Sequence, residues 1–292
     1  VFKAYSNPAT GWGYKSQPEP ALFGRTIPIP RGRVAGGSSS INAMVHLRGH
    51  PEDYDGWEKQ GARGWNYAAC LPYFKRLETS DGGGNAYRGD SGPVFAARGR
   101  LRNPIYESFL LSAQACGHPL SPDLNGEQAE GFSRLQATIR KGARCGAAAA
   151  YLQPALKREN CEIVTNAVAT RLLFDGRRAI GVACCVEGEE RNYFAAREVI
   201  LCGGSINSPK LLMLSGLGPP AHLKDRGIEV VADLPGVGQN LQDHADVVIE
   251  YETAAEASLA WAAKPWWFAL ILARWFLFRT GTAALTTLAP AG

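Results

Sequence analysis

The sequence lacks the patterns that would assign it to a simple structural class. It has no internal repeat and no low-complexity tract, and charged residues make up only 20% of its 292 residues. The uninterrupted apolar run at 266–273 is far shorter than the roughly 20 residues that cross a bilayer. Hydrophobic residues make up 46%, as in an ordinary globular protein. Disorder, collagen and coiled coil are therefore excluded.

Neither a charge block nor a metal-ligand spacing is present. The net charge is +4 and the basic residues are scattered, so no nucleic-acid interface is expected. The seven cysteines form no C-x-x-C pair, which excludes a zinc ribbon and a redox dithiol, and no metal site is predicted. An odd cysteine count predicts reduced, mostly buried thiols and a reducing compartment such as the cytoplasm.

The two ends of the sequence lack the features of natural termini. The chain begins Val1-Phe2-Lys3, with neither a Met nor a signal peptide, and it ends at Gly292 without a cap or tail. Both ends resemble cuts, so we expect an internal fragment of a longer protein.

Local patterns predict a mixture of helices and strands. Residues 1–38 are rich in Pro and Gly and predict an extended loop. Asn66 is a helix cap before 67–77, and Asn103-Pro104 begins a helix that Gly117 ends. Alternation at 168–174, a turn at Asp175-Gly176 and a return at 179–186 predict a hairpin, with a third strand around 192–195.

Two further elements are predicted towards the C-terminus. The apolar run 198–202 is typical of a buried parallel strand, and Ser208-Pro209 predicts the start of a helix at 209–215. Residues 265–279 hold six aromatic residues and predict a buried or interfacial helix, with contact to a membrane surface as the alternative.

Three motifs carry the chemistry. The first is Gly32-Arg33-Val34-Ala35-Gly36-Gly37-Ser38-Ser39-Ser40-Ile41-Asn42, whose glycine amides and short hydroxyls suit the phosphates of a cofactor. The second runs from Gly204 to Gly218 and the third from Leu234 to His244.

These motifs, in this order, resemble those of the glucose-methanol-choline (GMC) family of FAD-dependent alcohol oxidoreductases, closest to its choline dehydrogenase and alcohol dehydrogenase branch. The resemblance implies a Rossmann-like FAD-binding α/β fold with a substrate domain, incomplete at both ends. It implies FAD-binding segments at about 1–60 and 160–245, separated by a helical and loop insert at 61–159. Together these form an N-terminal region over 1–245, and 246–292 would begin the substrate-binding domain.

The resemblance also implies site residues. In the family the first motif surrounds the pyrophosphate and the flavin, and a later strand contacts the adenine through its backbone. The implied contacts here are Val34, Gly36, Gly37, Ser38, Asn42, Ala43, Met44, Val45 and Ala169. Some relatives attach FAD through a His where this chain has Ile41, so we expect noncovalent FAD.

The function implied is oxidation of a primary alcohol by hydride transfer to flavin N5, with a quinone or oxygen as the electron acceptor. The family's catalytic His lies near the C-terminus, so we expect it beyond Gly292 and assign no catalytic residue here. The G-x-G-x-x-G fingerprint of a dinucleotide fold is also missing before Gly32. We therefore expect the piece by itself to bind FAD weakly and to be inactive.

Two other classes stay open at this stage. One is a catalytically inactive remnant or interaction module of the same fold. The other is a serine hydrolase, because Gly89-Asp90-Ser91-Gly92-Pro93 resembles a protease nucleophile loop with His46 and His50 upstream. A Gly/Asp/Ser turn before a strand explains that segment more simply.

Overall fold

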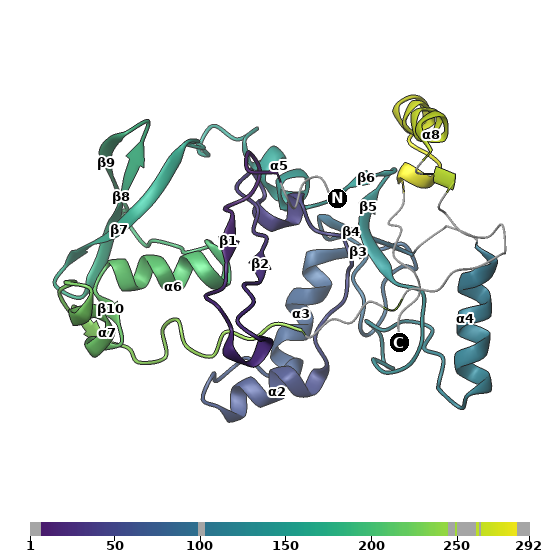
Figure 1. Ribbon diagram of the computed structural model, residues 1–292, viewed down its shortest axis with the longest axis horizontal. Helices are drawn as coiled ribbons and strands as arrows, with labels where there is room; N and C mark the ends of the chain where they lie inside the picture. The colour runs from purple at the N-terminus through teal and green to yellow at the C-terminus, as the bar shows by residue number, and fades with distance from the viewer. Residues whose placement is uncertain (1–6, 99–102, 245–248, 250–260, 263, 285–292) are drawn as a thin grey trace. The chain divides into compact units, whose positions relative to one another are not determined.

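The computed structural model describes residues 7–98, 103–244, 249, 261–262 and 264–284. The chain divides into two compact units, one of residues 1–161 with 252–292 and the other of residues 162–251. Both contain helices and strands, so the predicted mixed α and β composition is confirmed (Figure 1).

The first unit is organised around a four-stranded sheet in the order β3-β4-β5-β6 (Figure 1). Its strands are β3 (Glu78–Ser80), β4 (Val94–Arg98), β5 (Gln136–Arg140) and β6 (Ala143–Arg144). β3 and β4 are parallel, and the other pairs are antiparallel. Around the sheet lie α2 (Pro51–Lys59), α3 (Tyr67–Leu77), α4 (Pro104–Ala115), a π-helix (Ala148–Leu152) and α5 (Gln153–Ala155).

Capping residues set the helix boundaries of this unit, as predicted. The Asn66 side chain accepts a hydrogen bond from Ala69 N at the start of α3, and Asn103 caps α4 through Ile105 N. Gly117, with φ 84°, follows the end of α4. Residues 7–38 are mostly irregular, as expected, apart from the short antiparallel pair β1 (Tyr14–Lys15) and β2 (Pro28–Ile29).

The second unit contains the predicted three-stranded meander. Its strands are β7 (Ala167–Asp175), β8 (Arg178–Val186) and β9 (Glu189–Phe194). Helix α6 (Gly204–Leu214) is tied to β7 because Leu172 N donates to Ser215 Oγ at 2.8 Å. The unit also contains α7 (Pro220–Asp225) and the parallel pair β10 (Leu217–Gly218) and β11 (Ala232–Asp233).

Two predictions for this unit are wrong. Residues 198–202 form no strand, and Ile200 is 74% exposed. A buried parallel strand needs neighbours to bond with, and no strand in the described part of the chain pairs with these residues. Helix α6 begins at Gly204 instead of Pro209, so Ser208 is not its cap and the proline lies inside the helix.

The cysteines agree with the prediction only in part. All seven are free thiols. Three are buried (Cys70, Cys145 and Cys184), whereas Cys116 and Cys202 are exposed, so the expectation of mostly buried thiols is wrong. Burial raises the pKa of the Cys184 thiol.

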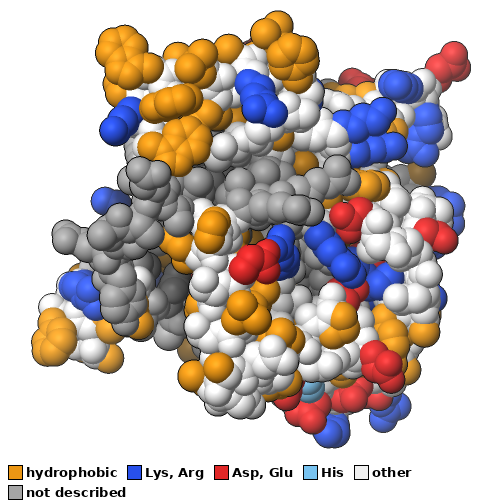
Figure 2. All heavy atoms as spheres, turned by 90° about the vertical axis from the view of Figure 1, so that its right-hand side faces the viewer, with side chains coloured by type: hydrophobic (Ala, Val, Ile, Leu, Met, Phe, Trp, Pro, Cys, Tyr) orange, Lys and Arg blue, Asp and Glu red, His pale blue; other side chains and the backbone are white. Residues whose placement is uncertain are grey.

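Helix α8 (Pro265–Phe278) confirms the predicted helix but not its burial. Its contact with the sheet is made by Trp275, whose indole Nε1 donates to Gly142 O at 2.7 Å and whose ring packs under Arg279. Most of its other large side chains are exposed: Trp266, Trp267, Phe268, Leu270, Phe276, Leu277 and Phe278. Figure 2 shows hydrophobic side chains gathered at the top of the face on which α8 lies. No described helix combines the length and hydropathy needed to cross a bilayer.

Candidate functional site

The Gly/Ser loop of the first motif folds into a tight turn followed by a short 3-10 helix, Gly37–Ser40. Gly36 and Gly37 both adopt left-handed backbone conformations, with φ of 85° and 56°. The turn is closed by Gly37 N donating to Val34 O at 2.8 Å. The loop is thus a defined backbone shape whose conformation depends on its glycines.

The three serine hydroxyls stabilise this loop from within. Ser39 Oγ donates to Gly36 O at 2.6 Å, and Ser40 Oγ donates to Ala35 O at 2.7 Å. Ser38 Oγ accepts from Gly32 N at 3.1 Å. Two of the hydroxyls predicted to face phosphate therefore bond to the loop itself, whereas the Ser38 hydroxyl keeps a proton to donate.

The backbone amides before the 3-10 helix are donors without a partner in the loop. Within the described residues, the N–H groups of Val34, Ala35 and Gly36 donate no hydrogen bond. A Cβ placed on Gly37 would meet no atom within 4 Å, so one side of the loop is open. No acidic residue occurs between Glu19 and Glu52. Consecutive free amides in a stretch of chain without acidic residues fit an anionic group such as a pyrophosphate.

The second half of the predicted contact set, residues 42–45, is fixed by the sheet. Asn42 Oδ1 accepts from Met44 N at 3.0 Å and from Arg144 Nη1 at 2.7 Å, which holds Met44 at a φ of 67°. Thr138 N donates to Met44 O at 2.8 Å, and Val45 pairs with Ala137. The backbone predicted to lie beside the flavin is therefore joined to β5 by an isolated antiparallel bridge, and the extended segment 44–48 is called the added strand below.

Ala169, the predicted adenine contact, lies on β7 in the second unit, whereas the other eight predicted residues belong to the first. It pairs with Cys184, and the register of the two strands shifts directly after it. Its role at a cofactor stays a prediction.

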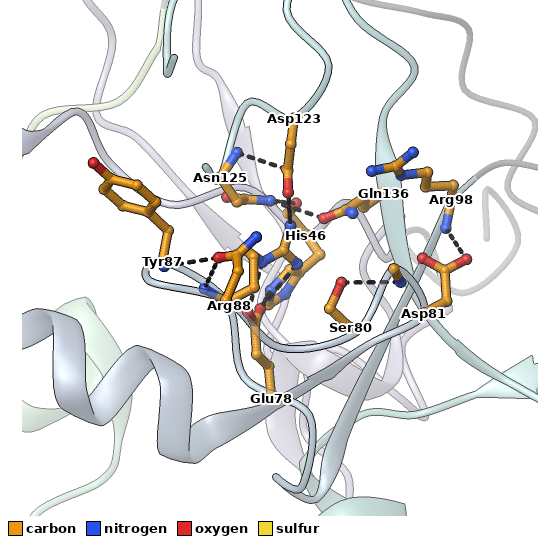
Figure 3. A network of polar contacts seen from close by, with 12 residues as sticks. His46, Glu78, Ser80, Asp81, Tyr87, Arg88, Arg98, Asp123, Asn125 and Gln136 are labelled. Atoms are coloured by element: carbon orange, nitrogen blue, oxygen red, sulfur yellow. Dashed lines mark hydrogen bonds and ion pairs between the residues drawn. The ribbon is translucent and has the colours of Figure 1, made fainter. Parts of the chain in front are cut away.

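A buried polar network, which the sequence patterns did not indicate, lies beside the added strand (Figure 3). At its centre is Glu78, with no exposed surface. Its carboxylate accepts from Arg88 Nε at 2.7 Å, from Arg48 Nη2 at 2.8 Å and from the Gly89 amide at 3.1 Å, and lies 2.7 Å from His46 Nε2. Arg88 also donates to both oxygens of Asp123.

Glu78 and Arg88, at the centre of this network, strongly favour their ionised forms. Burial by itself raises the pKa of the Glu78 carboxyl, but hydrogen bonds from His46, Arg88 and the Gly89 amide, together with the Arg48 charge, lower that pKa to about 2. Burial likewise acts to lower the pKa of Arg88, and the carboxylates of Glu78 and Asp123 reverse the effect and raise it. Glu78 and Arg88 therefore form an ionised pair in the core.

The protease-like alternative finds no support in this geometry. His46 is bonded to Glu78, and His50 caps α2 by accepting from Glu52 N. Ser91 lies in the turn in which Gly92 N bonds back to Glu78 O at 2.9 Å. Both histidines thus have partners other than Ser91, as expected for a structural turn.

Comparison with known proteins gives consistent matches. The sequence profile of the family described as GMC oxidoreductase matches residues 20–246. The oxygen-dependent choline dehydrogenase of Brucella anthropi is 49% identical over 273 residues, which is 94% of this chain and 50% of that protein. The mitochondrial choline dehydrogenase of Homo sapiens is 47% identical, covering 96% of this chain and 47% of that protein.

Solved structures give the same result. An FAD-dependent oxidoreductase from Chaetomium thermophilum matches with a TM-score of 0.84 at 29% identity, over 96% of this chain and 52% of that one. Pyridoxine 4-oxidase from Mesorbium loti matches with a TM-score of 0.72 at 31% identity, over 77% of this chain and 45% of that one. The chain spans about half the length of the curated relatives it matches.

Proposed function

Because the chain belongs to the GMC oxidoreductase family, we propose that its protein oxidises a primary alcohol with FAD as the cofactor. The observation that carries the proposal is the row of free amides at Val34, Ala35 and Gly36, which offers an anion site in the family's first motif. When bound, FAD supplies the hydride acceptor that protein side chains lack.

The described residues divide into two groups of cofactor contacts in this proposal. The amides of 34–36, the open side of Gly37 and the Ser38 hydroxyl bind the pyrophosphate. Asn42, Ala43, Met44 and Val45 line the isoalloxazine, and Ala169 contacts the adenine through its backbone. Ile41 is buried and offers no nucleophile, which supports noncovalent FAD. None of the described residues is assigned as the catalytic base.

The substrate proposed is a small primary alcohol, with choline the first to test because relatives at 49% and 47% identity are choline dehydrogenases. The purified full-length protein that contains this chain should reduce a redox dye when choline is added, and glycine betaine, which has no alcohol group, is the matched control. Oxygen uptake compared with quinone reduction then identifies the electron acceptor. A protein that binds FAD but reduces no dye with choline or with simple primary alcohols would contradict the proposed activity.

We also propose that α8 contacts an anionic membrane surface, in a protein that works in a reducing compartment such as the cytoplasm. The helix has 14 residues, exposes Trp and Phe near both ends, and lies in a segment, 257–292, that carries three basic residues and no acidic one. Tryptophan and basic side chains favour the interface of a bilayer.

Sedimentation with lipid vesicles tests this contact. Wild-type protein should sediment with vesicles that contain phosphatidylserine, and replacing the two most exposed side chains of the helix, Trp266→Gln with Leu277→Gln, should abolish the binding. Trp275 is left in place, so the anchoring bond to Gly142 remains. Wild-type protein that stays in the supernatant would rule out the contact.

A further inference from the structure

The added strand that carries the proposed flavin contacts bonds to β5 along only part of its length. Its bonds run from Thr138 N to Met44 O and from His46 N to Gln136 O, each at 2.8 Å. His46 O receives no bond from Gln136 N, and Arg48 N lies past Gln136, the first residue of β5, so neither group is bonded by the ladder.

The side chain of Asn125 bonds to both of these groups. Its Oδ1 accepts from Arg48 N at 2.8 Å, and its Nδ2 donates to His46 O at 2.9 Å (Figure 3). A residue of a neighbouring parallel strand would bind residues 46 and 48 through the same two groups. The same Nδ2 donates to Gln136 Oε1 at 3.1 Å, which fixes the orientation of the amide. The Asn125 side chain therefore binds two backbone groups that β5 does not bond.

Asn125 is itself held by the buried network. Its backbone N donates to Asp123 Oδ1 at 3.0 Å, Asp123 is bound by Arg88, and Arg88 is bound by Glu78. Only 4% of Asn125 is exposed, so water does not replace a bond that the side chain loses. A continuous set of polar contacts thus joins the ionised core to the backbone of the added strand.

We propose that Asn125 is a positioning residue that holds the strand 44–48 in the register that its cofactor contacts require. The inference rests on the proposed function. Asn125 touches neither reacting atoms nor cofactor in this account; it acts through the backbone of His46 and Arg48.

The variant Asn125→Asp tests the role because it keeps the size of the side chain and the acceptor for Arg48 N. It replaces the Nδ2 donor with an oxygen that faces His46 O and Gln136 Oε1. FAD should bind at least about tenfold more weakly to the purified full-length variant, as loss of one buried hydrogen bond predicts. The visible circular dichroism of the bound flavin should change as well.

Asn66→Asp is the matched control. Asn66 also accepts from a backbone amide and donates Nδ2 to an oxygen, that of Glu58, but it caps α3 away from the added strand. It should lower stability without changing the flavin signal. If Asn125→Asp does not fold, Gln136→Leu, which removes only the partner that orients the amide, should give a smaller change in the same direction.

The outcomes separate this inference from the function on which it rests. Wild-type protein that fails to bind FAD would overturn the proposed function and the positioning role together. Wild-type protein that binds FAD, with Asn125→Asp or Gln136→Leu indistinguishable from Asn66→Asp in FAD affinity and flavin dichroism, would overturn the positioning role alone.

Discussion

Replacing Glu78 with Gln should destabilise the protein by roughly 3–5 kcal/mol and lower its Tm by roughly 6–20 °C. The substitution preserves shape but removes the charge that Arg88 and Arg48 share at 2.7 and 2.8 Å. It also places the glutamine NH2 group, itself a donor, opposite some of the donors from which the Glu78 carboxylate accepts. Since Arg88 is only 1% exposed, its charge would lose one of its two carboxylate partners without gaining water. Thermal and urea unfolding measure the effect.

Glu130→Gln is the matched control, because the Glu130 carboxylate is exposed and lies 3.8 Å from His50. It should change stability by less than about 1 kcal/mol. Equal effects of the two variants would mean that Glu78 is not a buried ionised group.

Acid unfolding gives a second readout of the same carboxylate. The pKa of Glu78 is lowered from 4.5 to about 2, so its ionised form stabilises the folded state. This contribution, about 3 kcal/mol, is complete above pH 4.5 and is lost as the pH falls from there towards 2. The wild-type protein should therefore lose more stability over this range than Glu78→Gln does, and parallel acid profiles would contradict the assignment.

Replacing Gly36 with Ala should greatly weaken FAD binding. A Cβ at Gly36 would lie 2.6 Å from Ser40 Oγ and 2.9 Å from Ala148 N and Cβ, so the loop must move. That movement displaces the amides of 34–36. Loss of one hydrogen bond to an ionised group corresponds to roughly 10–100-fold weaker binding. Titration of FAD followed by flavin fluorescence measures the change.

Gly117→Ala separates this steric effect from backbone strain. Gly117 has a φ of 84°, against 85° for Gly36, but a Cβ there would meet nothing within 4 Å. Both variants place alanine in the left-handed region, at a cost of about 1–2 kcal/mol. Only Gly36→Ala should lose FAD, and equal FAD affinity in the two variants would remove the Gly36 loop from the cofactor site.

Elements with local signals were predicted well from the sequence. Asn66, Asn103 and Gly117 mark helix ends through their own side chains or backbone, and each is found where the pattern places it. The Asp175-Gly176 turn likewise joins β7 to β8. The strand predicted at 198–202 failed because an apolar run predicts burial, whereas a strand depends on partners elsewhere in the chain.

The buried network could not be predicted in the same way. Glu78 follows a helix in an ordinary polar stretch, and its partners His46, Arg48 and Arg88 lie 32, 30 and 10 residues away. Only the fold brings them together. The bonds of Asn125 to His46 and Arg48 likewise span 79 and 77 residues. The glycine motif could be predicted because its residues are adjacent in the sequence.

The visible absorption spectrum of the full-length protein that contains this chain, purified and recorded before and after acid precipitation, tests the central claim most directly. We predict flavin bands in an amount equimolar with the protein, and release of all the FAD into the acid supernatant because Ile41 offers no attachment point. Protein that shows no flavin bands, even after incubation with excess FAD, would contradict the account of residues 34–45 as a cofactor site.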